Sequence, residues 1–325
     1  MKAVYMGTPE IAAEILETLL SSGIEIIGVV TQPDKPKGRG KEMAFPPVKE
    51  VALKHQIPVY QPRRVKDLEF VEQLKVLAPD IILVVAFGQM LSRDILDLPP
   101  YGCINVHASL LPKYRGSAPI QWVILNGEER TGVTIMKMDA GCDTGDMILK
   151  KEIDISMEET GGSLHDKLAL IGGKALLEAI EQIKNGTATF TKQDDSQSTY
   201  IKMLTKDMGK IDFSNDAVLI ERMIRGLNPW PSAYTYYKGK TLKLWCAAVN
   251  NDPEMIKDAK EAGFGCVVKV TKEAIFVKTG DKLLEIKELQ LEGKKRMLTS
   301  EFLRGYPVIS GEVLGDYENK TLHHT

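Results

Sequence analysis

Two short stretches of the chain carry side chains that could transfer an acyl group together. In residues 102–112, Asn105 and His107 stand two apart after an apolar run. If residues 103–106 end a strand, both side chains point to the same side of the sheet. A second stretch, residues 139–146, supplies carboxylates. An amide donor beside an imidazole can stabilise an oxyanion, and a carboxylate can accept a proton, which is what acyl transfer to an amine requires.

Neither stretch decides the matter by itself. An isolated Asn-x-His is more often a turn residue beside a core histidine. Of the five histidines, however, His107 is the one at a predicted strand end next to a Gly- and Pro-rich segment. The local sequence does not choose among Asp139, Asp143 and Asp146, since each can form an Asx turn.

The composition limits the alternatives. The four cysteines show no C-x-x-C pairing, so the sequence predicts reduced thiols and no metal site. A Cys–His nucleophile that uses Cys103 or Cys142 remains an alternative. The net charge of −2 argues against a protein that coats nucleic acid broadly. A predicted first strand from Lys2, and the lack of an apolar run of about 20 residues, predict a cytoplasmic protein with no membrane partner.

The first half of the chain predicts alternating strands and helices. Four runs are apolar on both faces, as buried parallel strands are: 3–6, 24–30, 81–87 and 133–138. Residues 11–20 have helical spacing, with Thr8 as the predicted cap and Pro9 at the first position. The repeated βαβ pattern predicts an α/β fold, a Rossmann-like open parallel sheet with helices on both faces. Without a G-x-G-x-x-G or G-K-[ST] loop, a dinucleotide is disfavoured, yet the carboxyl ends of the strands should still bind the ligand.

The second half has a different pattern. A long helix is predicted over residues 164–183, followed by a polar stretch that reads as a surface linker. Beyond it, a helix at 218–226 precedes short alternating strands, which predict a small antiparallel β-barrel resembling an OB-fold. These strands are 234–237, 241–247, 265–270, 274–278 and 282–289. The expected domains are residues 1–188, a linker 189–206, a second domain 207–310 and a tail 311–325.

Two groups of basic residues are candidates for RNA contact. The first consists of Lys35, Lys37, Arg39 and Lys41. They lie among glycines and prolines after the second predicted strand, in either a solvated loop or a phosphate-binding loop that becomes ordered on RNA. The second consists of Lys202, Lys206 and Lys210. These share one face if residues 200–210 are helical, although a solvated charged face is the commoner explanation.

The motifs around these residues resemble those of the folate-dependent formyltransferases. The matching motifs are Met6-Gly-Thr-Pro9, Thr31-Gln-Pro-Asp34, Asn105-x-His107, Ser109-Leu-Leu-Pro112, Tyr114-Arg-Gly-Ser-Ala-Pro119, Thr131-Gly-Val-Thr134, Asp143-Thr-Gly-Asp146 and Asn228-Pro-Trp-Pro231. They span almost the whole chain. The resemblance implies a Rossmann-like catalytic domain followed by an OB-like domain that binds tRNA.

The resemblance also implies an activity. A formyl group would pass from 10-formyltetrahydrofolate to the free amino group of methionine on initiator methionyl-tRNA, for initiation of translation. Asn105 would donate a hydrogen bond to the oxyanion that forms when the amine attacks. His107, when protonated, would stabilise the same charge and help to protonate the leaving nitrogen. Asp143 would keep the imidazole charged and accept the proton of the amine, directly or through water.

Binding residues follow from the same resemblance. The folate would be held by Ser109, Leu110, Leu111, Pro112, Phe87, Gly88, Gln89, Met90, Leu91 and Asp139. Arg115 and Gly116 either shape the same loop or are simple turn residues. In the family the basic loop enters the acceptor arm of the tRNA, which makes Arg39 the first candidate for contact. A monomer would suffice, because each chain carries both domains.

Other functions remain open at this stage. The same chemistry could serve a small amine, such as a nucleotide or an amino sugar, or could use water and make the protein a formyl-folate hydrolase. A non-enzymatic RNA-binding module is the alternative from another class. The basic loop and the second domain favour tRNA over a small acceptor. The presence of Asn105, His107 and Asp143 argues against a purely RNA-binding module.

Overall fold

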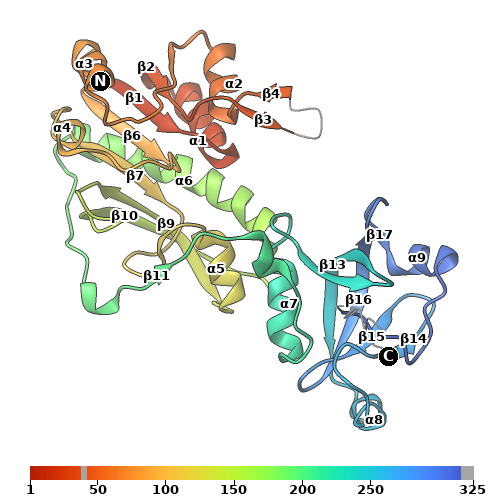
Figure 1. Cartoon of the computed structure of the whole chain (residues 1–325). Coiled ribbons are helices and arrows are strands. Elements are labelled where there is room, and N and C mark those ends of the chain that lie inside the picture. Colours follow the sequence, from red (N-terminus) through yellow and green to blue (C-terminus); the bar gives the residue numbers. More distant parts are fainter. Residues whose placement is uncertain (38–41, 316–325) are drawn as a thin grey trace, which may run out of the picture. The chain divides into compact units, whose positions relative to one another are not determined.

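The computed structural model describes residues 1–37 and 42–315. The chain divides into two compact units (Figure 1). The first unit contains Met1–Pro119, Glu129–Asp154 and Ser163–Lys202. The second contains Ile120–Glu128, Ile155–Gly162 and the residues from Met203 onwards. Two short segments from the first half of the sequence therefore group with the second unit.

The first unit is a layered α/β structure. Its elements, in chain order, are β1 (Lys2–Gly7), α1 (Glu10–Ser21), β2 (Glu25–Val30), β3 (Lys35–Lys37), β4 (Glu42–Ala44), α2 (Pro47–Lys54), β5 (Val59–Tyr60), α3 (Leu68–Leu77), β6 (Ile81–Val85), α4 (Arg93–Leu96), β7 (Cys103–His107), β8 (Arg115–Gly116), β9 (Arg130–Lys137), β10 (Met147–Asp154), α6 (Gly161–Lys184), a 3-10 helix (Asp195–Gln197) and β11 (Tyr200–Ile201).

A sheet at the centre of this unit carries the candidate site. In the described part of the chain it has seven strands, in the order β10-β9-β7-β6-β1-β2-β5. The strands from β5 to β7 are parallel, whereas β9 runs antiparallel to both β7 and β10. The predicted α/β fold is confirmed, but the sheet is mixed. The apolar run at 133–138 gave no sign of this, because hydrophobicity reports burial and not strand direction.

Alternation along β7 decides where its polar side chains point. The Cys103 thiol lies 3.5 Å from the carbonyl oxygen of Ile95 in α4, on the face that α3 and α4 cover. Val106 faces α6 on the opposite side. Because alternate residues of a strand share a face, Asn105 and His107 point to the same side as Cys103, as expected. Figure 1 shows α6 as the long helix that runs along the sheet.

The first helix lies where it is predicted, but it begins at Glu10, one residue later than expected, and its cap differs. Pro9 is the N-cap residue of α1, and the helix has no side-chain cap. The Thr8 hydroxyl instead donates to the carbonyl oxygen of Phe87, at 3.3 Å. The prediction that Thr8 caps this helix is therefore wrong, because the hydroxyl ties β1 to the end of β6.

The described part of the basic segment is a hairpin of β3 and β4, which pair antiparallel. Its base is held by an ion pair between Lys49 Nζ and Asp34 Oδ2 at 2.6 Å, and by Gln61, whose amide donates to Asp34 Oδ1 at 2.7 Å. Lys35 is exposed on β3. Outside the described residues lie Arg39 and Lys41.

The second unit has an antiparallel sheet. Its elements are α5 (Pro119–Leu125), a 3-10 helix (Lys206–Gly209), α7 (Ala217–Gly226), β12 (Ala233–Tyr237), β13 (Lys240–Asn250), α8 (Pro253–Asp258), β14 (Val267–Val270), β15 (Ile275–Lys278), β16 (Leu283–Leu291), β17 (Met297–Leu298) and α9 (Thr299–Gly305). The strand order is β12-β13-β16-β15-β14, with β17 added to β16. The sheet packs its core against α7 and α9 through Ile220, Ile224 and Phe302. The antiparallel architecture is as predicted.

A membrane-spanning helix is not found among the described residues: none of their helices is both long and apolar enough.

Residues 200–210 are not an α-helix, so the condition under which the three lysines would share one face is not met. This stretch consists of β11, an extended connection and the short 3-10 helix, so Lys202, Lys206 and Lys210 do not share a helical face. Gly209 explains part of the difference, because a Cβ there would lie 2.2 Å from the carbonyl oxygen of Ser232. Close packing of the backbone in the second unit overrides the helical spacing of the lysines.

Candidate active site

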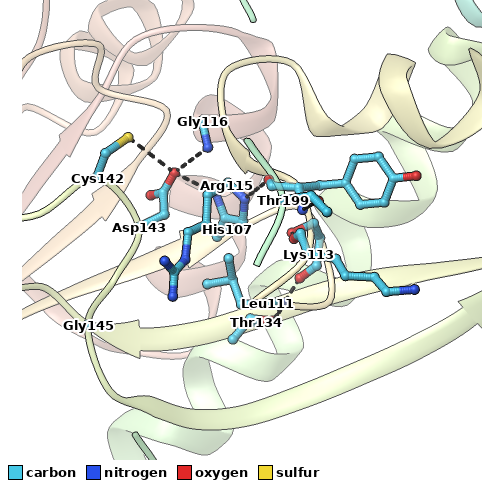
Figure 2. Close-up of polar contacts among 12 residues, drawn as sticks. His107, Leu111, Lys113, Arg115, Gly116, Thr134, Cys142, Asp143, Gly145 and Thr199 are labelled. Carbon is cyan, nitrogen blue, oxygen red and sulfur yellow. Dashed lines mark hydrogen bonds and ion pairs between the residues drawn. The ribbon is translucent and has the colours of Figure 1, made fainter. Parts of the chain in front are cut away.

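β7 delivers a nearly buried imidazole to the end of the sheet. His107 is 6% exposed, and its Nε2 lies 2.8 Å from the carbonyl oxygen of Tyr114. Because a carbonyl oxygen accepts and cannot donate, Nε2 carries the hydrogen of this bond. The other ring nitrogen, Nδ1, lies 3.7 Å from Asp143 Oδ2 (Figure 2). A proton exchanged with a ligand or with Asp143 therefore moves through Nδ1.

The side-chain amide of Asn105 differs from the His107 imidazole in its hydrogen bonding. Its side chain is 8% exposed. It makes no hydrogen bond within residues 1–37 and 42–315. A buried polar group without a partner costs free energy, so an amide in this state is available for a ligand that accepts a hydrogen bond. It lies two positions before His107 on the same face of β7.

The structure separates the three carboxylates that the sequence could not. Asp143 is the one of the three that faces His107. Asp139 forms a turn within its own loop, where it accepts hydrogen bonds from the Gly141 amide at 3.0 Å and the Thr144 hydroxyl at 2.6 Å. Asp146 is exposed. Geometry therefore brings one carboxylate to the imidazole, and the other two stay in the surrounding loop.

The Asp143 carboxylate is held by a main-chain donor. The N–H of Gly116 donates to Asp143 Oδ2 at 2.8 Å. Gly116 has a φ of +104°, and a Cβ at this position would lie 2.6 Å from the carbonyl oxygen of Ile201. Glycine is therefore required here by both the backbone conformation and the close approach of β11. Asp143 itself has a φ of +55°, in the left-handed region.

The residue before Gly116 is a buried arginine. The sequence did not decide whether this residue, Arg115, shapes the loop or only forms a turn. Arg115 is 1% exposed. Its guanidinium donates to Gln193 Oε1 from Nε at 3.0 Å and from Nη2 at 2.8 Å. It also reaches Asp195 at 2.7 Å and the Tyr200 hydroxyl at 3.0 Å. Gln193 in turn donates to the carbonyl oxygens of residues 143 and 145. Sequence reasoning missed Gln193, because it stands in a polar run that reads as surface linker.

Residues 109–112 form a turn fixed by internal hydrogen bonds. The Thr134 hydroxyl donates to the carbonyl oxygen of Ser109 at 2.7 Å and accepts the amide N–H of Leu111 at 3.1 Å. Ser109 and Leu111 are buried, whereas Leu110 and Pro112 are partly exposed. A ligand at this turn would therefore meet Leu110, Pro112 and the backbone. The predicted folate contacts of these residues stay a prediction.

The predicted folate contacts in the loop after β6 also divide into buried and exposed residues. Phe87 and Leu91 are buried in the core, and Gln89 accepts a backbone N–H through Oε1 at 2.8 Å. Gly88 and Met90 are exposed. Gly88 and Met90 can therefore face a ligand, while Phe87 and Leu91 hold the loop in place. Gln89 also holds the loop, through Oε1, but its buried Nε2 has no hydrogen-bond partner in the described part of the chain and is a donor that a ligand could use. Their predicted part in folate binding is likewise untested.

Side chains of the types that bind metal ions also lie close together away from this site. In the described residues, one group meets the distances of a metal site, Glu14, His165 and Asp166. It lies on α1 and α6, and both carboxylates are exposed. None of its members belongs to the candidate site.

The two thiols near the site do not resemble nucleophiles. Burial raises the pKa of the Cys103 thiol to about 12. Partial burial, and then the negative charge of Asp143, raise the pKa of the Cys142 thiol. A nucleophilic cysteine needs the reverse shift, because the thiolate is the reactive form. The Cys–His alternative is therefore disfavoured.

We expect the variants Cys103→Ala and Cys142→Ala each to keep at least about a third of wild-type kcat, because neither thiol forms a covalent intermediate. The measurement is formyl transfer under saturating substrates. Loss of more than about 100-fold in either variant, with the melting temperature unchanged, would restore the thiol as a nucleophile.

Two protein families match the chain. One is described as formyl transferase and matches residues 1–180; the other is described as formyl transferase, C-terminal domain, and matches residues 203–307. Proteins named methionyl-tRNA formyltransferase from Agathobacter rectalis and Clostridioides difficile are 52% and 50% identical to the chain. The alignments cover 96% and 97% of this chain and 98% and 100% of those relatives.

The fold has a counterpart among solved structures. An N-formyltransferase from Helicobacter canadensis, in complex with folinic acid and dTDP-3-aminofucose, matches with a TM-score of 0.64. The match covers 91% of this chain and 100% of that chain, at 20% sequence identity. At this identity the likeness concerns the fold alone.

Proposed function

The chain belongs to the formyl transferase family, and from this membership we propose that it formylates the free amino group of methionine on initiator methionyl-tRNA. The formyl donor is 10-formyltetrahydrofolate. Relatives of about half-identical sequence, aligned over nearly the full length of both chains, carry the name of this activity. Because translation takes place in the cytoplasm, we place the enzyme there. It acts as a monomer, since one chain carries both matched domains.

One observation supports the chemistry above the rest. At the end of β7, the unpartnered amide of Asn105 lies beside an imidazole whose Nδ1 faces Asp143 at 3.7 Å. An oxyanion needs a donor that is already oriented, and a proton transfer needs an acid and a base within reach. These three groups supply both requirements at one place.

We assign the steps as follows. Asn105 donates to the oxyanion that forms when the amine attacks the formyl carbon. Asp143 accepts the proton that the amine loses, directly or through water. His107, protonated at Nδ1, stabilises the oxyanion and gives that proton to the leaving nitrogen as the carbon–nitrogen bond breaks. A proton passed from Asp143 to His107 restores the starting state, so the enzyme gains and loses none.

The RNA is bound by other parts of the chain. Residues 1–188 carry the chemistry, and residues 207–310 form a second domain that binds tRNA. The hairpin of β3 and β4 supports a role at the acceptor arm, because it carries the exposed Lys35 and leads into the basic segment. With the helix at 200–210 excluded, Lys202, Lys206 and Lys210 are candidates by charge alone.

The experiment that tests the function is formyl transfer from 10-formyltetrahydrofolate to methionyl initiator tRNA. Deacylated tRNA and free amines, including an amino-sugar nucleotide, serve as controls. Transfer to the charged initiator alone supports the proposal. Transfer to a small amine, or donor hydrolysis without transfer, would keep the chemistry and overturn the acceptor.

For Arg39→Ala we expect the KM for methionyl-tRNA to rise about tenfold with kcat little changed, because one charge-assisted contact is worth about 1.5–3 kcal/mol. The slope of log KM against log salt should fall by about 0.7–0.9, the share of one phosphate contact. The matched control is Lys75→Ala, an exposed lysine paired with Glu72 on α3. Equal behaviour of the two variants would remove Arg39 from the interface.

A further inference from the structure

We infer that Gln193 is a positioning residue, which fixes the Asp143 carboxylate beside His107, and that Arg115 holds Gln193 in the orientation this requires. The inference rests on the proposed function, since it takes Asp143 as the proton acceptor. It assigns work to a residue outside the predicted catalytic set, in the polar stretch between the two matched domains.

The side chain of Gln193 forms hydrogen bonds with the main chain of the Asp143 loop. Its side-chain amide donates from Nε2 to the carbonyl oxygens of Asp143 and Gly145, both at 2.8 Å. The residue is only 5% exposed, so water does not readily replace these bonds. The two carbonyls lie on either side of one intervening residue. One amide therefore closes the turn that carries the carboxylate.

Arg115 makes the orientation of this amide unambiguous. A guanidinium group has only donors, and a main-chain carbonyl oxygen only accepts. The oxygen of Gln193 must then face Arg115, at 3.0 and 2.8 Å, and its nitrogen must face the two carbonyls. If the amide were flipped, every one of these contacts would be repulsive. The buried charge of Arg115 thus directs the Gln193 amide toward the loop.

The loop needs this support because of its backbone conformation. Asp143 has a φ of +55°, which non-glycine residues rarely adopt without constraint from their surroundings. Gln193 holds the main-chain end of Asp143, and the Gly116 amide holds the carboxylate end at 2.8 Å. Without the first of these constraints the residue can relax, and the carboxylate moves away from Nδ1 of His107. Figure 2 shows one carboxylate oxygen facing both the Gly116 amide and the imidazole.

Two variants of Gln193 test the inference. Gln193→Leu removes all four hydrogen bonds, and Gln193→Glu keeps the contact with Arg115 but places an acceptor against two carbonyls. We expect both to lower kcat by about 10- to 100-fold, because small displacements of a reacting group have effects of this size. The KM values for donor and tRNA should change less than about threefold.

The matched controls remove the outer partners of Arg115. Asp195→Ala and Tyr200→Phe each delete one hydrogen bond of the guanidinium, at side chains that are largely exposed, and leave Gln193 untouched. We expect kcat within about twofold of wild type for both, as is usual for surface substitutions. Equal losses in the controls and in the Gln193 variants would mean that disturbing Arg115 in general, and not Gln193, lowers activity.

A double-mutant cycle separates positioning from a general structural effect. In an Asp143→Asn background, Gln193→Leu should change kcat less than about twofold, because the group it positions has already lost its function. A further loss as large as in the wild-type background would overturn the inference. So would near-normal kcat in Gln193→Leu.

Amide hydrogen exchange, which requires no turnover, tests the role of Gln193 separately from the proposed function. The Gly116 amide hydrogen, bonded to Asp143, should exchange with solvent about tenfold faster or more in Gln193→Leu, and unchanged in Tyr200→Phe. Unchanged exchange in Gln193→Leu would overturn the positioning role. A wild-type enzyme that does not formylate methionyl-tRNA would overturn the proposed function, while the exchange result would still judge Gln193.

Discussion

The variant His107→Ala is expected to lose about 100- to 1,000-fold in kcat, and Asn105→Ala a similar factor, because each removes a donor aimed at the developing oxyanion. The two side chains are nearly buried at the end of β7, so water is a poor substitute for either. The measurement is single-turnover formyl transfer with both substrates saturating. Melting temperatures identify variants that have lost activity through unfolding.

A second histidine provides the matched control. His55 pairs with Glu17 at 2.9 Å on the surface of the first unit, and its side chain is 35% exposed. We expect His55→Ala to keep kcat within about twofold of wild type. The assignment of Asn105 and His107 fails if both alanine variants retain more than about a tenth of wild-type kcat.

The variant Asp143→Asn is expected to lower kcat by about 100- to 10,000-fold, the range that general acid–base catalysis spans. The substitution is nearly isosteric. Its amide oxygen can still accept the N–H of Gly116, so the loop keeps its anchor while the proton acceptor disappears. We expect activity to be lost while folate binding is preserved. Turnover measures the first, and a fluorescence titration with the formyl donor measures the second.

Asp146→Asn is the comparison for this prediction. It removes a carboxylate from the same loop, at an exposed position. We expect kcat within about twofold of wild type. If Asp146→Asn loses as much activity as Asp143→Asn, the charge of the loop as a whole matters, and no single carboxylate acts as the base.

Several strands were predicted well, because apolar runs in the sequence report which strands are buried. The strands β1, β6 and β12 fall within a residue or two of the predicted runs. The parallel direction predicted for the run at 133–138 is wrong, because β9 is antiparallel to both of its neighbours and a run that is apolar on both faces fits either direction. A helix over residues 200–210 was considered because Lys202, Lys206 and Lys210 are four residues apart, and the structure has β11 and a short 3-10 helix there instead.

The candidate site was predicted only in part, because some of its contacts come from segments that are distant in the sequence. A strand end places Asn105 and His107 on one face, which local geometry alone dictates. The choice of Asp143 over its neighbours depends on the Gly116 amide, which comes from a distant segment. The burial of Gln193 depends on Arg115, 78 residues earlier. A polar residue that is buried against one particular partner has no local signature, so composition assigned it to the surface.

The groups on either side of Arg115 belong to the main chain: the carbonyl oxygen of Tyr114 and the N–H of Gly116. Their contacts with the imidazole and the carboxylate do not depend on which side chain residue 114 carries. One inserted residue, however, would move the two groups by about 3.3 Å relative to each other. That is close to the 3.7 Å between His107 and Asp143. Over evolution residue 114 can accept exchanges of side chain, yet the segment of residues 114–116 is expected to keep its length.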